Sequence, residues 1–224
     1  MGKALVLILG HFFIRRLHAF ITRSHDNEYT TKLGISTPDF ICKWHGVGGR
    51  TVAKVLKYVL SVVKEFGPDI ILQLGTNDLV NSSPLTVGSS LEHLVTVLHD
   101  VYKVDLICVC QTLRRSSLEV LFNKNAGLLT RYLKTVPEPI PYAFFWSYRG
   151  FWKTKSAFLS QDGVHLNGRG QHKFYRSLRG AVLRYTRVKS AEHNKIFKTT
   201  SVTNLSAFSH NFLKPKVNDT FLMT

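Results

Sequence analysis

A histidine and an aspartate near the carboxyl-terminal end of the patterned region have the spacing of an acid–base pair. Asp162 lies three residues before His165 in the segment DGVH. A carboxylate on a tight turn can hold a nearby imidazole in one orientation and stabilise its protonated form. His165 is therefore a candidate general base, and Asp162 is the candidate that orients it. Taken alone, the same residues would also fit a solvated loop histidine.

Two other segments carry groups that could stabilise a developing negative charge on oxygen. Gly49, in the segment GVGGRT, could offer its backbone N–H, and Asn77, in LGTND, could offer its side-chain amide. Such donors form the oxyanion hole of acyl-transfer enzymes, and glycine lets a substrate approach the backbone closely because it has no Cβ. As isolated residues, both also fit ordinary turns.

Apolar runs and helical patterns alternate along residues 4–185. We expect strands at 4–9, 39–44, 69–74, 104–110 and 142–146, and helices at 13–22, 51–66, 86–102, 116–133 and 167–185. This alternation predicts a mostly parallel sheet with helices on both faces. The carboxyl ends of parallel strands meet at one edge of the sheet, so segments far apart in sequence can share one crevice there.

The segments GHF at 10–12, GVGGRT at 46–51, GTND at 75–78 and DGVH at 162–165 follow one another in this order. They resemble the blocks of the SGNH (GDSL-like) lipase and esterase family, which read roughly GDS, GxSGxT, GxND and DxxH. The resemblance covers about residues 4–185. It implies a three-layer α/β/α sandwich with a flavodoxin-like five-stranded sheet. It also implies ester or acyl hydrolysis, with Gly49 and Asn77 as oxyanion donors and Asp162 and His165 as the catalytic pair.

The first block departs from the family pattern at the residue that performs the attack. Phe12 stands where the family has its nucleophilic serine, and His11 stands where it has aspartate. Phenylalanine has no oxygen, so no acyl-enzyme can form on it. A site that has lost its nucleophile keeps only the rate that the oxyanion donors and substrate binding supply. We interpret the chain as an esterase-like domain with impaired catalysis whose expected substrate is a small ester or acyl compound. An alternative is a pseudoenzyme that binds an acyl or glycan ligand without turning it over.

Other hydroxyl groups lie near these blocks in the sequence, on Thr51, Thr76, Ser82 and Ser83. None of them is predicted to sit on the sharp strand-to-helix turn that presents a nucleophile. We therefore do not expect them to replace the missing serine.

The composition favours a single domain at residues 1–186, followed by a basic segment at 187–224. The chain has 224 residues, with 30 Lys and Arg against 14 Asp and Glu, a net charge of +16. Periodicity fades after about residue 186, and the remainder is rich in Lys, Ser, Thr and Asn, which predicts a disordered tail. The positive charge favours anionic partners such as nucleic acid. An alternative function is therefore a nucleic-acid-associated module, since SGNH-like domains also occur in proteins of some LINE-type retrotransposons.

No pattern in the sequence indicates a metal, a cofactor or a membrane span. Cys108 and Cys110 form a CxC pair without a nearby histidine or third cysteine, which is a poor zinc signal. Together with Cys42, they are expected to be free thiols in a reducing compartment. The apolar run at 4–9 is short and lacks a signal-peptide cleavage site, so we expect an intracellular protein. The sequence gives no indication of oligomeric state.

The nucleic-acid alternative predicts a steep dependence of binding on salt. If Lys and Arg contact phosphates, log Kobs should fall with log[salt] with a slope of about −0.7 to −0.9 per contact. Fluorescence anisotropy with a labelled oligonucleotide between 50 and 200 mM salt, about the range over which such complexes weaken strongly, measures this slope. A flat salt response, or no binding at low salt, would remove this alternative.

Overall fold

The structure is a computed structural model. It describes residues 4–24, 30–36, 40–58, 60–66, 69–116, 119–135, 140–152 and 157–184. The predicted basic tail at 187–224 lies outside the described residues.

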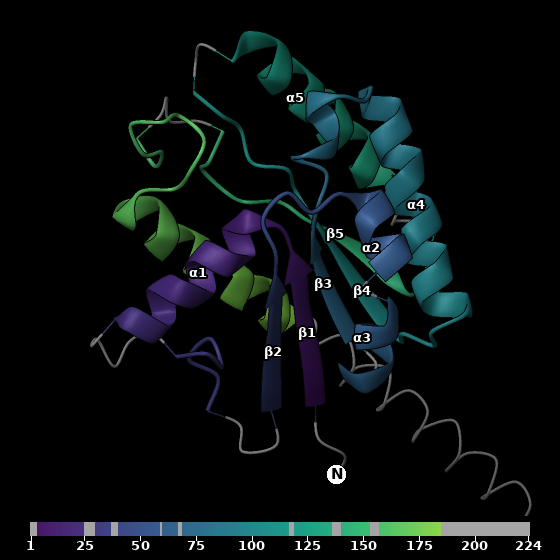
Figure 1. The fold of residues 1–224 in the computed structure, drawn as a ribbon. Helices are drawn as coiled ribbons and strands as arrows, with labels where there is room; N and C mark the ends of the chain where they lie inside the picture. Colours follow the sequence, from purple (N-terminus) through teal and green to yellow (C-terminus); the bar gives the residue numbers. More distant parts are fainter. Residues whose placement is uncertain are drawn as a thin grey trace, which may run out of the picture. The chain divides into compact units, whose positions relative to one another are not determined.

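One parallel sheet runs through the centre of the fold (Figure 1). Its five strands are β1 (Ala4–Gly10), β2 (Phe40–Gly46), β3 (Asp69–Gln73), β4 (Leu106–Cys110) and β5 (Ala143–Trp146). The spatial order is β2-β1-β3-β4-β5, and every neighbouring pair is parallel. This is the flavodoxin-like order, so the predicted sheet is confirmed.

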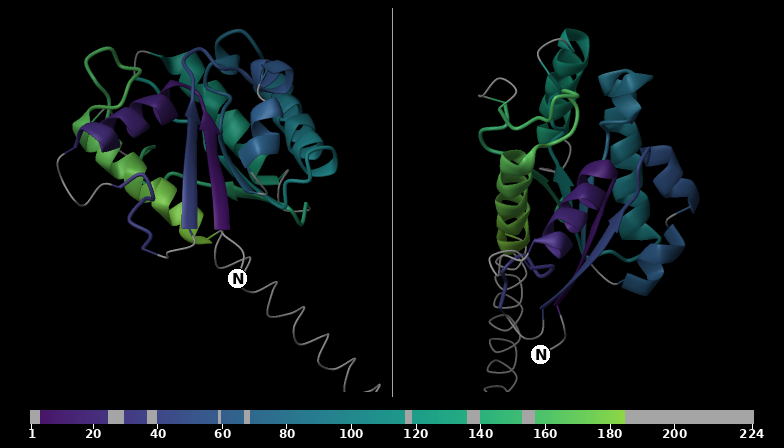
Figure 2. Two further views of the ribbon diagram at one scale, coloured as in Figure 1. Left: turned by 60° about the horizontal axis from the view of Figure 1, so that its bottom comes forward. Right: turned by 60° about the vertical axis from the view of Figure 1, so that its left-hand side comes forward.

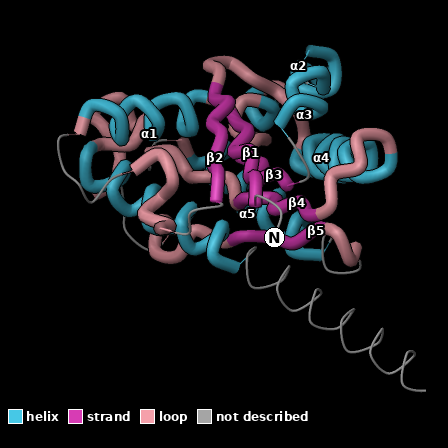
Figure 3. The backbone as a smooth tube through the Cα atoms, turned by 90° about the horizontal axis from the view of Figure 1, so that it is seen from below, coloured by secondary structure: helices cyan, strands magenta, loops and turns pink. Residues whose placement is uncertain are grey.

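Helices cover both faces of the sheet, and the layers separate clearly when the molecule is turned (Figure 2). On one face lie α1 (Phe12–Arg23) and a helix at residues 168–184. On the other lie α2 (Val52–Tyr58), α3 (Leu60–Phe66), α4 (Pro84–Asp100) and α5 (Val120–Thr135). The predicted three-layer α/β/α sandwich is confirmed. Seen from below, the strands form a twisted row between the two helical layers (Figure 3).

The core explains why the strands read as continuous apolar runs. Alternate residues of β1 and β3, such as Leu7, Leu9, Ile70 and Leu72, join one buried cluster with α2, α4 and α5. On the opposite side of the sheet, Phe13 of α1 and Phe174 of the helix at 168–184 are buried with their ring centroids 6.1 Å apart. Both faces of the inner strands β1, β3 and β4 are therefore covered, as parallel sheets require, whereas the edge strand β2 is only partly buried.

The main difference from the sequence prediction concerns the helix expected at 116–133. Its described part begins at Val120, and residues 111–116 form no regular element. Asn123 accounts for this, because its side chain accepts a hydrogen bond from Arg115 N (2.9 Å) and donates one to Ser116 O (2.8 Å). These bonds hold the preceding segment against the helix in a non-helical path.

Among the described residues, no helix combines the length and the apolar character that crossing a membrane requires.

The close approach of α1 to β2 depends on a glycine. A Cβ at Gly46 would overlap the backbone of Ile14 and Arg15, with Arg15 Cα only 2.8 Å away. We predict that Gly46→Ala lowers the free energy of unfolding by about 1–3 kcal/mol, the usual cost of overpacking. Urea denaturation measures the change.

Gly127 in α5 provides the matched control, since its added Cβ would meet Trp152 at an ordinary 3.8 Å. Gly127→Ala should stabilise the protein by up to about 1 kcal/mol because alanine is the better helix former. Equal effects of the two substitutions would contradict the packing described for α1 and β2.

Candidate active site

Three of the four sequence blocks meet where β1, β2 and β3 end. Gly10, the last residue of β1, pairs with Gly46 of β2 on one side and with Gln73 of β3 on the other. The strands therefore end at the same level. The loops that follow the three strands therefore begin side by side, next to the first residues of α1.

His165 and Asp162 form the pair that their spacing predicts. His165 Nδ1 lies 2.5 Å from Asp162 Oδ2, while Asp162 Oδ1 accepts hydrogen bonds from the backbone N–H groups of Val164 (2.9 Å) and His165 (2.8 Å). The bonds from His165 and Val164 hold the pKa of the Asp162 carboxyl well below its usual range. Asp162 is therefore ionised and fixes the orientation of the imidazole.

Backbone bonds close the turn that carries this pair. His165 O accepts a hydrogen bond from Ser160 N (2.7 Å), and Gly163, at φ 67°, donates its N–H to Ser160 O (2.9 Å). Gly163 O in turn accepts from Ser116 N (2.7 Å). A positive φ is costly for residues with a Cβ, so glycine suits this position.

Phe12 is the first residue of α1 and contacts His165. The two ring centroids are 4.8 Å apart, with the rings at 73° in an edge-to-face arrangement. Phe12 is only 9% exposed. The structure thus brings the position that the resemblance assigns to the nucleophile against the candidate base, with a hydrocarbon ring there in place of a hydroxyl.

His11 is fully buried beside Phe12 and Phe13, at ring-centroid distances of 4.7 and 5.2 Å. Neither of its ring nitrogens has a hydrogen-bond partner within the described part of the chain. Burial, assisted by the positive charges of Arg115 and Arg50, lowers the pKa of His11 to about 3. His11 is therefore neutral at pH 7.

The two candidate oxyanion donors lie on adjoining loops. Gly49 is exposed and has φ 65°. Asn77 Nδ2 donates a hydrogen bond to the carbonyl oxygen of Arg50, the residue after Gly49, at 2.8 Å. A primary amide carries two hydrogens, so one remains for another acceptor. The side chain of Asn77 makes no capping bond to its own turn, which argues against the local-cap interpretation.

Asp78 binds the same two loops together from the other direction. Its Oδ1 accepts a hydrogen bond from Val52 N at the start of α2 (2.9 Å). Burial raises the pKa of Asp78, although its backbone hydrogen bonds oppose that shift. Asp78, the aspartate of LGTND, thus supports the loop that carries GVGGRT. The carboxylate that pairs with His165 is that of Asp162.

Sequence reasoning missed Arg50, which is 6% exposed. Its Nη1 donates to His45 O (2.9 Å) and Gly10 O (3.4 Å), and its Nη2 lies 3.0 Å from His45 Nε2. Burial lowers the pKa of the guanidinium. The side chain thereby links the ends of β1 and β2. An arginine inside a glycine-rich loop was the only signal in the sequence.

Two of the four alternative hydroxyl groups are hydrogen-bonded to backbone N–H groups, whereas the buried Thr76 Oγ1 has no hydrogen-bond partner within the described residues. Thr51 Oγ1 accepts from Lys54 N (3.3 Å), and Ser83 Oγ caps α4 by accepting from Thr86 N (3.1 Å). Thr76 is buried. Ser82 lines a pocket of about 440 Å³ beside η1 (Asp78–Val80).

Within the described residues, no group of three or more His, Cys, Asp or Glu side chains could hold a metal ion. Cys42, Cys108 and Cys110 form no disulfide bond, and the Sγ atoms of the last two lie 4.0 Å apart in the interior.

Comparisons with solved structures place this fold among esterases. An acetyl esterase, solved as a mutant with acetate, is 15% identical and aligns over 85% of this chain and 100% of its own, with a TM-score of 0.58. An acetylxylan esterase from Geobacillus stearothermophilus is 13% identical over 80% and 94% of the two chains, with a TM-score of 0.61. A Streptococcus pneumonia protein named after platelet activating factor is 15% identical over 81% and 85%, with a TM-score of 0.62.

The Geobacillus enzyme was also solved as three catalytic mutants, in which a serine, an aspartate or a histidine is replaced by alanine. Its aspartate precedes its histidine by three residues. No family model matches the chain, and no curated protein matches it. The structural likeness is that of SGNH-type esterases and acylhydrolases, and at these identities it concerns the fold.

Buried His11 predicts a loss of stability in mild acid. The pKa of His11 is about 3 in the folded protein and about 6.5 in an unfolded chain, so the unfolded state binds the extra proton first. The contribution of neutral His11 to the free energy of unfolding is complete above pH 6.5. It falls by about 1.4 kcal/mol per pH unit as the pH drops toward 3. Urea denaturation at pH 7, 6 and 5 measures it.

In this experiment His11→Gln should flatten the decline in stability between pH 6.5 and 5. His93→Gln is the matched control, since His93 is exposed on α4, and it should leave the decline unchanged. A wild-type slope retained by His11→Gln would show that His11 is not the buried neutral group described.

Proposed function

We propose that this chain, which has the SGNH hydrolase fold, is an esterase-type domain whose hydrolytic step is disabled by Phe12. The domain retains the His165–Asp162 pair and the loops that carry Gly49 and Asn77. It lacks a hydroxyl group at position 12, the first residue of α1. The parent reaction is hydrolysis of a small ester or acyl group.

One observation carries the proposal, the edge-to-face contact between Phe12 and His165 at 4.8 Å. In an acyl-transfer site the group beside the imidazole is the nucleophile, which gives its proton to the histidine. Phe12 occupies that place with a ring that has neither a lone pair nor an acidic proton. The remaining parts can polarise and hold a carbonyl, but they cannot form an acyl-enzyme.

A serine at position 12 would complete the reaction. Its Oγ would attack the ester carbonyl while His165 takes the hydroxyl proton, with Asp162 stabilising the imidazolium. The N–H of Gly49 and the second amide hydrogen of Asn77 would bind the oxyanion. His165 would return the proton to the leaving alkoxide. Water, activated by His165, would then release the carboxylic acid and regenerate the serine.

The comparisons support this assignment of roles. The catalytic aspartate and histidine of the Geobacillus esterase are three residues apart, as Asp162 and His165 are. That enzyme also has a catalytic serine, for which Phe12 is the counterpart in this proposal.

Phe12→Ser should create measurable esterase activity. We expect kcat/KM for p-nitrophenyl acetate to rise by at least about 100-fold over the wild type, a small part of what an intact triad contributes. Release of p-nitrophenolate at pH 8, followed by absorbance, measures the rate. Unfolding in urea checks that each variant is folded.

Two controls separate the effect of adding a hydroxyl group from the effect of removing the Phe12 ring. Phe12→Ala opens the same space without a nucleophile and should stay at the wild-type rate. Phe12→Ser combined with His165→Ala should lose the gain. Robust turnover by the wild type that depends on His165 would refute the inactive assignment, and a gain in Phe12→Ser that survives His165→Ala would refute the assignment of His165.

A further inference from the structure

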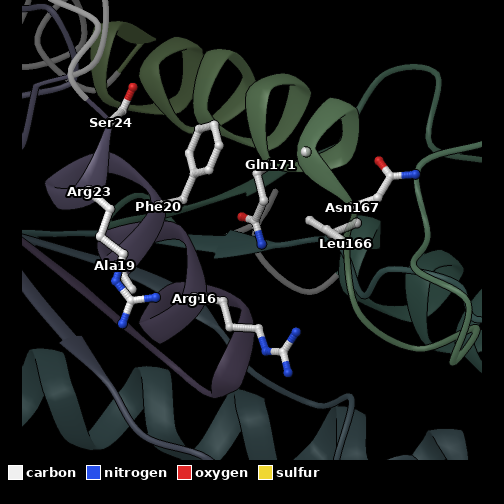
Figure 4. A pocket seen from close by; sticks show the side chains of 9 residues that line it. Arg16, Ala19, Phe20, Arg23, Ser24, Leu166, Asn167 and Gln171 are labelled. Carbon is white, nitrogen blue, oxygen red and sulfur yellow. The ribbon is translucent and has the colours of Figure 1, made fainter.

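A second pocket lies between α1 and the start of the helix at 168–184. Its volume is about 500 Å³. Figure 4 shows Arg16 and Arg23 extending from α1, and Gln171 extending from the opposite helix, around this space. Leu166, the residue after His165, also lines it.

The two arginines give the pocket a positive charge that nothing described nearby neutralises. Arg16 and Arg23 are both exposed. The pocket lining includes no Asp or Glu. The arginines are seven residues apart, or about two helical turns, so they project from the same side of α1.

Gln171 is an independent sign that the pocket is built to hold a ligand. The residue is only 6% exposed, yet its Oε1 is buried without a hydrogen-bond partner within the described residues. Leaving a buried polar atom unpaired is unfavourable, because the atom loses its hydrogen bonds to water without gaining another partner. A protonated ligand oxygen could satisfy Oε1, and the amide Nε2 could donate to an anionic one.

The start of the helix at 168–184 adds backbone donors to the same pocket. Asn167 uses its Oδ1 to accept from Gly170 N (2.9 Å) and its carbonyl to accept from Gln171 N (2.8 Å). The N–H groups of residues 168 and 169 precede these bonds and have no intrahelical partner. A Cβ at Gly168 would meet nothing within 4 Å. This end of the helix is therefore open to an anion, which its dipole favours.

We propose that this pocket binds the phosphate group of a small phosphate ester. Arginine forks match phosphate oxygens in geometry as well as charge, and a singly protonated phosphate can also donate to Gln171 Oε1. Phe20 and Leu166 supply apolar wall for the organic part. This site goes beyond the proposed esterase ancestry and does not depend on the residue at position 12.

Titration of the wild-type chain tests the proposal, with phenyl phosphate and inorganic phosphate as separate probes in low-salt buffer followed by isothermal calorimetry. We expect saturable binding of phenyl phosphate, weakened at least tenfold in Arg16→Ala/Arg23→Ala. Tighter binding of phenyl phosphate than of inorganic phosphate identifies the ester as the ligand. Tighter binding of inorganic phosphate overturns that identification.

Matched variants separate a built site from general attraction to a basic protein. Arg131→Ala/Lys134→Ala removes the same charge from exposed positions on α5, on the other face of the sheet, and should bind phenyl phosphate as the wild type does. Gln171→Leu should weaken binding several-fold without lowering the free energy of unfolding, because Oε1 has no partner to lose. No saturable binding, or equal losses in the α1 and α5 double variants, overturns the proposal.

Discussion

Two hydrogen bonds join the loops after β2 and β3 at the candidate active site. Asn77 Nδ2 binds Arg50 O, and Val52 N binds Asp78 Oδ1. Beneath them, the guanidinium of Arg50 contacts carbonyl oxygens at the ends of β1 and β2. The ends of β1, β2 and β3 are thereby fixed to one another next to the first residues of α1. The position of every candidate site residue except the Asp162–His165 turn depends on this link.

The hydrogen bonds of the two aspartates contribute to the fold whether or not the site performs a reaction. Asp162 closes its own turn through backbone N–H groups, and Asp78 anchors the start of α2, so each contributes to the fold without any reaction. Phe12 is compatible with this frame because its neighbours are the rings of His11, Phe13 and His165. Under the proposed function, a phenylalanine in place of serine at this point removes the nucleophile and adds aromatic contacts. The aromatic contacts of Phe12 are therefore compatible with an intact fold.

Much of this arrangement could be predicted from sequence. The alternating apolar runs predicted the parallel sheet and its three layers, and the spacing of Asp162 and His165 predicted a pair that the structure forms. Contacts that need the tertiary register could not be predicted in this way. Arginine is rarely buried, and Arg50 is buried only because Gly10 and His45 present carbonyl oxygens to it. The bond from the Tyr148 hydroxyl to Gln73 Oε1, in the interior, joins residues 75 positions apart. Neither residue type signals that contact in advance.

Labelling with a fluorophosphonate tests the central claim most directly, because the reagent reacts covalently with an activated serine or threonine and reports on every hydroxyl of the folded protein at once. Intact-mass analysis of the wild-type chain should show no phosphonate adduct, since the place beside His165 is held by Phe12. A single adduct on wild type that disappears when His165 is replaced by alanine would contradict this account. It would show that another hydroxyl has taken over the attack and that the domain is a working esterase.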